Sequence, residues 1–340
     1  MSASSCQAWV FANRDAKGYY RVAYTPEGLK KIAQIAEKQL NVPERIAFLE
    51  DAWAMTRATK TSAVDFLAVS QALRGEQNRH VMDLLGTHLR YLKDSAVSAD
   101  RQQKFDHFVQ VQFGALAKKL GWNPLPSDTD DQKALRASLL ETLGAAGDQE
   151  AVAVARHIVE QYMENPTSVE GTISGPAFAI AAANGSPALY DRFLQALSSS
   201  KSSDEYYHYL YALADFAQPQ LFERTIALID QDKVRQQDYP RFFGALLSNP
   251  AAREATWRYL KAHWNVLAQK VTSFGGAGAI SALGNACSAE MRDDIEQFFG
   301  THPAPGAERA VQQSLERIDS CIDFKHAQAS ALHEWLSNQQ

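Results

Sequence analysis

The chain has 340 residues, which is long enough for two domains or for one elongated array of repeats. Hydrophobic residues make up 46% of the sequence and charged residues 21%, which excludes wholesale disorder and predicts a packed fold. The formal net charge of -5 provides no basic surface for phosphate groups, so the sequence argues against a nucleic-acid partner.

Residues 8–24 predict a β-hairpin. Their sequence, AWVFANRDAKGYYRVAY, alternates apolar and polar positions on both sides of a central turn, and aromatic and β-branched residues are dense on each side. Gly18 suits a turn position that needs a positive φ. Asn13 and Arg21 are expected to satisfy backbone groups where the hairpin meets the residues that follow. We therefore assign residues 1–26 to a β-hairpin and transition segment.

The pattern changes period after the hairpin and predicts helices to the end of the sequence. Leu29, Ile32 and Ala36 fall three or four residues apart, which places them on one face of a helix. Further on, Ser62 with Asp65 fits a capping box at the start of another helix. No second strand-rich region follows.

The connections between the predicted helices are short, which favours antiparallel neighbours. Many such pairs in series cannot close into one bundle, so we expect an all-α fold, an α-solenoid of antiparallel helix pairs over residues 27–340. The consensus patterns of tetratricopeptide, ankyrin and leucine-rich repeats are absent, and no clean period is visible. Any repeat is therefore expected to be of the degenerate HEAT or armadillo kind.

The sequence contains no residue set that predicts catalysis, cofactor binding or a metal. Zinc held on a helix needs two histidines at i and i+4 with a glutamate beside the first. The His-Glu step at His333-Glu334 lacks the second histidine. His80 and His88 could share a helical face, but no carboxylate cluster accompanies them, which favours a structural role. No GxSxG or comparable motif fixes a nucleophilic serine.

The three cysteines, Cys6, Cys287 and Cys321, are far apart and odd in number. This pattern argues against a disulfide framework and a CxxC metal site, and it predicts free thiols. No stretch approaches the roughly 18 apolar residues that a transmembrane helix needs, and the start lacks the basic and apolar regions of a signal peptide. We therefore expect no membrane partner and slightly favour the cytoplasm, although a targeting region of a longer parent protein would not be visible here.

Two aromatic clusters lie at residues 206–211 and 257–264. Packing in a core is favoured over a ligand-binding surface for both. In the first cluster aromatic residues occupy neighbouring positions all around the helix, so at least one of them must face solvent or an interface.

Three blocks of the sequence resemble the C-terminal domain of M1-type zinc aminopeptidases. The first, WVFAN followed by GYYRVAY, is similar to the family's W-x-x-x-N…G-[FY]-Y-R-V-x-Y entry, and RIAFLEDAWA resembles its R-x-x-L-x-D-D-A-[FW]-x-L helix. The third block, over residues 249–264, is similar to the N-x-x-x-R-x-x-[AT]-W-x-[FY]-[LF]-x-x-[HN]-W run near the family's C-terminal end, whereas residues 60–235 match only as generic helices. The family-motif residues, to which we assign structural roles, are Trp9, Asn13, Gly18, Tyr20, Arg21, Tyr24, Arg45, Asp51, Trp53, Trp257 and Trp264.

This resemblance implies a non-catalytic domain that caps the active site of a metalloaminopeptidase and shapes peptide access and length selection. The zinc and its ligands would lie in an upstream domain, so no cofactor is expected in this chain and the chain alone is expected to be inactive. The implied partners are that upstream zinc domain of the same polypeptide and peptide substrates. Two other classes stay open: a free-standing helical scaffold that binds a protein in its concave face, and a helical enzyme of unrecognised type.

Overall fold

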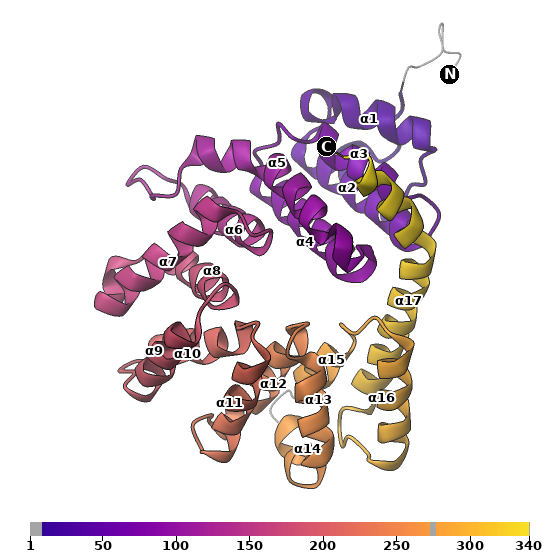
Figure 1. Cartoon of the computed structure of the whole chain (residues 1–340). Helices are drawn as coiled ribbons and strands as arrows, with labels where there is room; N and C mark the ends of the chain where they lie inside the picture. The colour runs from indigo at the N-terminus through magenta and orange to yellow at the C-terminus, as the bar shows by residue number, and fades with distance from the viewer. Residues whose placement is uncertain (1–8, 273–276, 340) are drawn as a thin grey trace, which may run out of the picture. The chain divides into compact units, whose positions relative to one another are not determined.

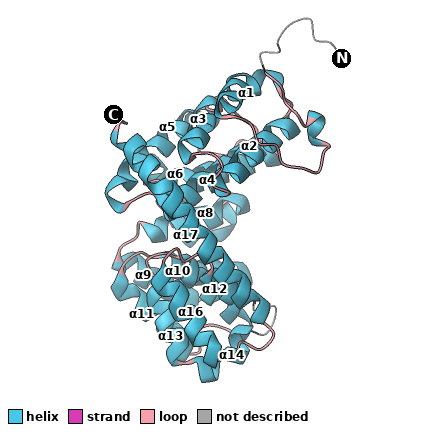
Figure 2. Ribbon diagram, turned by 90° about the vertical axis from the view of Figure 1, so that its right-hand side faces the viewer, coloured by secondary structure: helices cyan, strands magenta, loops and turns pink. Residues whose placement is uncertain are grey.

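The computed structural model describes residues 9–272 and 277–339. Within these residues the secondary structure is helical and no β-strand occurs (Figure 2). The predicted all-α class is therefore confirmed. The chain divides into two compact units: unit 1 comprises Met1–Ala151 and Phe324–Gln340, and unit 2 comprises Val152–Asp323.

Unit 1 is built from consecutive helices at the N-terminal end of the chain, labelled in Figure 1. They are η1 (Arg14–Ala16), α1 (Pro26–Gln39), α2 (Val42–Arg57), α3 (Ala63–Ala72), α4 (Arg79–Ala96), η2 (Ala99–Arg101), α5 (Gln102–Leu120) and α6 (Asp130–Ala145). Helix α7 (Gln149–Glu164) begins in unit 1 and continues in unit 2, whereas α17 (Glu308–Ser337) begins in unit 2 and ends in unit 1.

Local sequence explains where these helices start. Ser62 accepts a hydrogen bond from the N–H of Val64, and Asp65 accepts one from the N–H of Ser62, which confirms the predicted capping box at α3. A second capping box joins Asn41 and Glu44 at the start of α2. Each box satisfies backbone donors that the first helical turn leaves without an intrahelical acceptor.

Helices two positions apart in the sequence pack against each other in unit 1. Helix α1 contacts α3, α2 contacts α4, and α4 contacts α6. The C-terminal end of α17 joins this core, because the Gln328 side chain accepts a hydrogen bond from the N–H of Ala63 at 2.8 Å and donates to the carbonyl of Thr61 at 3.1 Å. Two stretches of chain more than 260 residues apart are thereby held by one buried amide.

Unit 2 continues with a second series of helices. They are η3 (Pro166–Ser168), α8 (Gly171–Ala183), α9 (Pro187–Ser198), α10 (Ser203–Asp215), α11 (Pro219–Asp230), η4 (Gln236–Asp238), α12 (Tyr239–Ser248), α13 (Arg253–Ala262), α14 (Trp264–Thr272), α15 (Ala277–Leu283) and α16 (Ala289–Thr301).

Unit 2 repeats one packing pattern along the chain. Helix α8 contacts α10, α10 contacts α12, and α12 contacts α15, while α11 contacts α13. Hydrogen bonds between helices of unit 2 include those of Ser174 with His208, Tyr190 with Thr225 and Ser314 with Ile280, at separations of 34, 35 and 34 residues.

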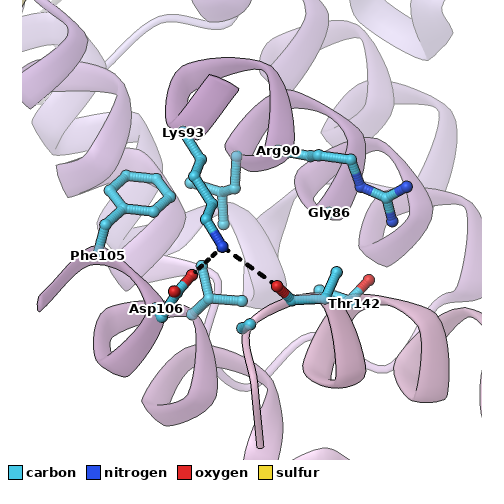
Figure 3. Close-up of a pocket in the computed structure, with 10 residues that line it drawn as sticks. Gly86, Arg90, Lys93, Phe105, Asp106 and Thr142 are labelled. Atoms are coloured by element: carbon cyan, nitrogen blue, oxygen red, sulfur yellow. Dashed lines mark hydrogen bonds and ion pairs between the residues drawn. The ribbon is translucent and has the colours of Figure 1, made fainter. Parts of the chain in front are cut away.

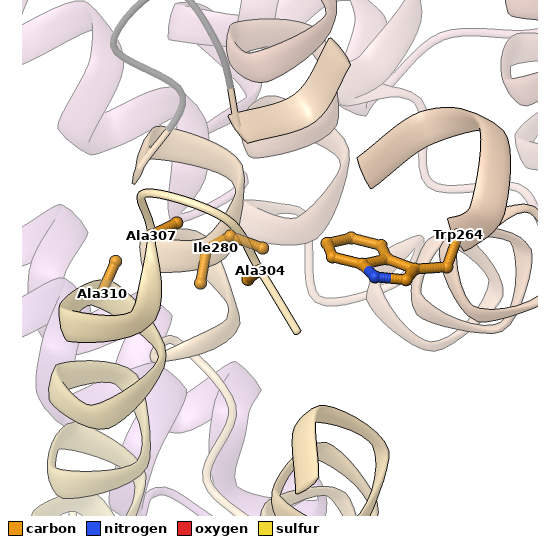
Figure 4. Packing of buried hydrophobic residues seen from close by; sticks show 5 residues of the cluster. All are labelled: Trp264, Ile280, Ala304, Ala307 and Ala310. Carbon is orange, nitrogen blue, oxygen red and sulfur yellow. The ribbon is translucent and has the colours of Figure 1, made fainter. Parts of the chain in front are cut away.

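A hydrophobic cluster of unit 2 surrounds Trp264, whose ring lies against small side chains (Figure 4). Its other buried members are Ile280, Ala304, Ala307 and Ala310. The indole N–H donates to the carbonyl of Pro303 at 3.3 Å, so the buried ring keeps its polar atom satisfied. Alanines leave the space that a large flat side chain needs.

The predicted β-hairpin is wrong for the described part of residues 8–24. Residues 9–24 contain the short turn η1 and extended or bent segments, but no strand ladder. Side chains join the two arms where backbone bonds were expected, and an isolated two-stranded hairpin is only marginally stable. Alternation of apolar and polar residues was read as strand pairing because an extended segment that packs on one side has the same period.

The prediction of free thiols is also wrong for two of the three cysteines. Cys287, which precedes α16, forms a disulfide with Cys321 on α17, across 34 residues of sequence. The wide sequence separation argued against a disulfide, but the fold brings the residue before α16 next to α17. Cys6 lies outside the described residues.

Candidate functional site

The N-terminal segment, residues 9–25, is held as a closed loop by two residues of the family motif. The Asn13 side chain donates to the carbonyl of Gly18 at 3.1 Å and accepts from the N–H of Gly18 at 2.7 Å. Gly18 does not have a positive φ, contrary to the prediction. Glycine is needed there for space, because a Cβ atom would lie 2.1 Å from the Tyr20 ring.

Two tyrosines fasten the arms of this loop to each other. The Tyr20 hydroxyl donates to the carbonyl of Ala12 at 2.7 Å, and the Tyr24 hydroxyl accepts from the N–H of Ala12 at 3.3 Å. The Tyr24 ring also packs on Phe48 of α2, with 6.0 Å between ring centroids, and burial raises the pKa of its hydroxyl. The loop is therefore anchored to α2 by packing and closed by side-chain hydrogen bonds.

Arg21 connects the loop to two carboxylates at the centre of α2. Its guanidinium lies 3.4 Å from Glu50 and 3.5 Å from Asp51, so the prediction that it satisfies backbone groups is replaced by an ion-pair role. Asp51 is only 1% exposed, and burial raises the pKa of its carboxyl despite the nearby guanidinium.

Glu50 has a second partner, the buried His88 of α4, whose Nε2 lies 2.9 Å from Oε1 of Glu50. This hydrogen bond is the main reason that the pKa of Glu50 is lowered. The ring of Trp53 stacks on His88, with 4.5 Å between centroids, and also contacts Phe66 of α3. The chain of contacts thus runs from the N-terminal loop through α2 to α4 and α3, and His88 has the structural role that was predicted.

Arg45, another motif residue, lies at the start of α2 and pairs with Glu76, which follows α3. The guanidinium donates to Oε1 of Glu76 at 3.3 Å and to the carbonyl of Leu40 at 2.7 Å. Glu76 is 5% exposed and also accepts the N–H groups of Gln77 and Asn78. The ion pair therefore joins the start of α2 and the preceding Leu40 to the connection that follows α3.

Several large apolar side chains of the N-terminal loop are exposed. They are Trp9, Val10, Tyr19 and Tyr20, with values of 62% for Val10 and 54% for Tyr20. Exposed large apolar side chains that lie near one another in the sequence are candidates for an interaction site. The loop is therefore anchored through Tyr24 and Arg21, and it keeps exposed apolar side chains.

The remaining two motif residues lie in unit 2. The indole of Trp257 is buried and donates to Oδ2 of Asp294 at 2.7 Å, while Trp264 fills the cluster described above. Phe298 packs edge-on against both rings. The prediction that this aromatic cluster packs in a core is confirmed for the two tryptophans.

The aromatic cluster at 206–211 is partly exposed, as predicted. Tyr206 and Tyr209 are buried, whereas Tyr207 and Tyr211 are partly exposed and stack in parallel at 5.8 Å between centroids. Arg241 lies over the Tyr211 ring at 4.6 Å. These contacts hold α10 against α12.

The described residues contain no group of three or more His, Cys, Asp or Glu side chains that could hold a metal ion. The described residues therefore do not fit the zinc that the family resemblance implies for the whole enzyme, and no step of metal chemistry is assigned to them. No helix of the described part is long and apolar enough to cross a membrane.

One serine and histidine pair was missed by sequence reasoning. Ser174 Oγ lies 2.8 Å from His208 Nε2, and His208 Nδ1 lies 2.7 Å from the carbonyl of Asp204. Ser174 is 1% exposed, and its hydroxyl also has the carbonyl of Gly171 as an acceptor at 2.9 Å. A substrate cannot reach that oxygen, so the pair joins α8 to α10 and does not form a catalytic dyad.

A small cavity of unit 1 is equally unsuited to a substrate. Its volume is about 30 Å³, and Gly86, Phe105 and Thr142 line it (Figure 3). Lys93 reaches across it to Asp106 at 2.6 Å and donates to the carbonyl of Ala145 at 3.1 Å. Space of this size holds a single water molecule.

Comparison with known proteins agrees with the sequence blocks. Residues 9–320 match the family described as "ERAP1-like C-terminal domain". Aminopeptidase 2, mitochondrial, of Saccharomyces cerevisiae is 23% identical over 330 residues, which is 95% of this chain and 35% of the relative. Aminopeptidase M1-C of rice is 26% identical over 91% of this chain and 36% of its own length, and human glutamyl aminopeptidase is 24% identical over 98% of this chain and 36% of its own length.

The chain spans about a third of the length of the curated relatives that it matches. The match includes motif residues of both units, among them Trp53 in unit 1 and the buried Trp264 in unit 2. Because the match covers residues 9–320, the chain belongs to the family of ERAP1-like C-terminal domains.

Proposed function

We propose that this chain is the non-catalytic C-terminal domain of an M1-type zinc aminopeptidase, and that it caps the active site and shapes peptide access and length selection. The family match over residues 9–320 carries the proposal. The relatives are aminopeptidases almost three times as long as the matched region, so their remaining parts have room for the zinc, its ligands and the catalytic base. Those residues have no counterpart among the described residues of this chain.

We propose that the exposed face of the N-terminal loop packs against the zinc-containing part of the same polypeptide. Trp9, Val10, Tyr19 and Tyr20 provide the apolar contact area. Residues 1–26 would then be the transition segment, and the Asn13, Gly18 and Arg21 contacts would hold it in the conformation that the partner requires. Residues 27–340 would form the helical domain.

We further propose that the helix pairs are arranged as an α-solenoid. Support comes from packing between helices two positions apart, which recurs from α1 with α3 to α10 with α12. Three hydrogen-bonded pairs of unit 2 at separations of 34 or 35 residues are a second support, because a stacked repeat brings equivalent positions together once per period.

The disulfide between Cys287 and Cys321 bears on the compartment. Structural disulfides persist in oxidising environments and are rare in the cytoplasm. We therefore propose an oxidising compartment in place of the cytoplasm that the sequence slightly favoured. Thiol counting by mass spectrometry on protein isolated under alkylating conditions tests this: one alkylated cysteine is expected, and three would contradict the proposal.

A reconstitution experiment tests the function. The purified chain is expected to contain no stoichiometric zinc and to hydrolyse no aminoacyl anilide. Added to a separately expressed zinc-containing part of an M1 relative, it is expected to stimulate hydrolysis of long peptides more than hydrolysis of an aminoacyl anilide, because only the former reach the domain.

The same experiment with Val10→Asp and Tyr19→Asp together tests the docking surface. This variant is expected to fold normally, because both side chains are exposed, and to lose the stimulation. Val266→Asp, at an exposed valine of unit 2, is the matched control and should stimulate like the unaltered chain. Zinc-dependent turnover by the chain alone would overturn the proposal, and tight binding of an unrelated protein without stimulation would favour the free-standing scaffold.

A further inference from the structure

Unit 1 contains an open cleft of about 1140 Å³ beside α5. Its walls come from the C-terminal end of α3, from one face of α5, from the turn between α6 and α7 and from residue 339. Phe108 and Val111 give the cleft an apolar part, and Val111 is exposed. The volume exceeds that of an ordinary small-molecule pocket, so a chain segment fits it better than a single metabolite.

The side chains that line the cleft are rich in primary amides. The glutamines among them are Gln71, Gln103, Gln110, Gln149 and Gln339. Gln110 uses its amide nitrogen on the carbonyl of Ala146 at 2.7 Å, and Gln339 uses its own on the carbonyl of Trp335 at 3.4 Å. The side chains of the other three make no hydrogen bond to any described residue, so their donors and acceptors are available to a ligand.

Charges of both signs line the cleft. Arg74, which follows α3, and Lys104 on α5 are basic, whereas Asp106 on α5, Asp148 before α7 and Glu150 on α7 are acidic. Lys104 donates to the carbonyl of Gln339 at 2.7 Å, Asp148 accepts the N–H of Ala151, and Glu150 accepts the indole N–H of Trp122. None of these contacts neutralises a charge. A polyanion would meet three carboxylates here, which argues against a nucleic acid or an anionic lipid surface.

We propose that this cleft binds an extended peptide segment through its main chain. A glutamine amide presents one carbonyl and one NH₂ group, the same acceptor and donor types that a peptide backbone presents in return. Amide pairs of this kind recognise the peptide backbone whatever its side chains are. Phe108 and Val111 supply apolar contact, and the basic and acidic groups of the cleft accept termini or side chains of either sign. The inference rests on the proposed function for the source of the peptide, but the binding itself needs no peptidase part.

The test compares two fluorescent peptides of identical side chains, one unmodified and one N-methylated at alternate residues, titrated into the full 340-residue chain and followed by anisotropy. N-methylation removes main-chain donors and leaves the side chains unchanged. The unmodified peptide is expected to bind weakly, since no second site tethers it, and roughly tenfold more tightly than the methylated one if two hydrogen bonds are lost.

Variants assign the binding to the cleft. Gln103→Ala combined with Gln149→Ala is expected to weaken binding of the unmodified peptide by roughly tenfold, and to abolish the preference over the methylated peptide. Both residues are exposed, so the fold should survive, as circular dichroism can verify. Gln195→Ala on α9, at an exposed glutamine outside the cleft, should leave affinity and preference unchanged.

Equal affinity for the two peptides, no detectable binding, or the same loss in the Gln195→Ala control would each overturn the assignment. These outcomes can be separated from failure of the proposed function. A chain that stimulates a zinc-containing partner but shows no backbone preference refutes the cleft alone, whereas a chain with the preference but no stimulation refutes the capping role alone.

Discussion

The two units join their helices through different kinds of side-chain contact. Unit 1 joins elements through a largely buried ion pair, Arg45 with Glu76, and through a buried amide, Gln328 with Ala63. Unit 2 buries a neutral link, Tyr190 with Thr225, and its ion pairs Arg192 with Glu160 and Arg224 with Asp191 are exposed. The clearest difference is therefore that a buried link of unit 1 carries charge, whereas that of unit 2 is neutral.

One large expected effect comes from the buried charge of unit 1. Arg45→Ala leaves the Glu76 carboxylate buried with two backbone N–H groups but no counter-charge. We expect a loss of about 3 kcal/mol in the free energy of unfolding, since removal of one partner of a buried pair costs more than the pair contributes. Urea denaturation measures the loss, and hydrogen exchange should locate it in residues 26–145.

Arg90→Ala is the matched control for that change. Arg90 also pairs with a glutamate, Glu141, but both side chains are nearly half exposed. The expected loss is below about 1 kcal/mol. Equal losses in the two variants would show that burial is not what gives the Arg45 pair its importance.

The disulfide between Cys287 and Cys321 is expected to stabilise unit 2. Cys321→Ser opens a loop of 34 residues, and the entropy of the unfolded chain then predicts a loss of about 3.8 kcal/mol. Chemical denaturation with and without reductant measures it. Reductant should lower the stability of the unaltered chain and leave the variant unchanged; a variant that still responds would place the effect elsewhere.

We expect a group in unit 1 to reduce stability at acid pH and groups in unit 2 to reduce it at alkaline pH. The pKa of Glu50 in unit 1 is lowered, chiefly by His88, so this carboxylate contributes stability above its ordinary value of 4.5 and loses it as the pH falls through the folded value. In unit 2, burial raises the pKa of Tyr209 and of Tyr211 to about 12. Both hydroxyls therefore contribute stability below pH 10.0 that is lost as the pH rises toward 12.

Unfolding followed by circular dichroism at a series of pH values tests both expectations. Glu50→Gln should reduce the loss of stability at acid pH and leave the loss at alkaline pH unchanged. Tyr211→Phe should reduce the loss at alkaline pH and leave the loss at acid pH unchanged. If either variant altered both sides equally, the two units would not titrate separately.

The sequence predicted helices well because burial of one face imposes a 3.6-residue period, as Leu29, Ile32 and Ala36 illustrate. It could not predict which helices join in unit 2, because the residues that join them differ in kind: Ser174 with His208, Tyr190 with Thr225 and Cys287 with Cys321. Disulfide pairing was hidden for the same reason.

The N-terminal loop is a second region whose structure the sequence did not predict correctly. Its motif residues were found, and their clustering around α2 agrees with structural roles, but the hairpin was not formed. Alternation reports which side of a segment is buried, not whether its backbone is paired. The glutamine-lined cleft gave no signal at all, because α3, α5 and the turn after α6 contribute residues at unrelated spacings.

The smallest expected effect tests the neutral links of unit 2. In the fully buried pair of Tyr190 and Thr225, the tyrosine hydroxyl lies 3.0 Å from Thr225 Oγ1, and that oxygen also lies 2.9 Å from the carbonyl of Leu221. The threonine proton satisfies the carbonyl, so the tyrosine is the donor in the pair. Tyr190→Phe therefore removes one hydrogen bond but leaves no donor unsatisfied, and we expect a loss of only about 1 kcal/mol.

Thr225→Val is the informative counterpart, because it removes the acceptor and leaves the buried Tyr190 hydroxyl without a partner among the described residues. The expected loss is about 2 kcal/mol, since an orphaned buried donor loses its water without gaining a replacement. Urea denaturation of the two variants should rank Thr225→Val below Tyr190→Phe in stability. If the order were reversed, ring packing against Phe216 would contribute more than the hydroxyl bond, and the neutral link would not be what stabilises the packing of unit 2.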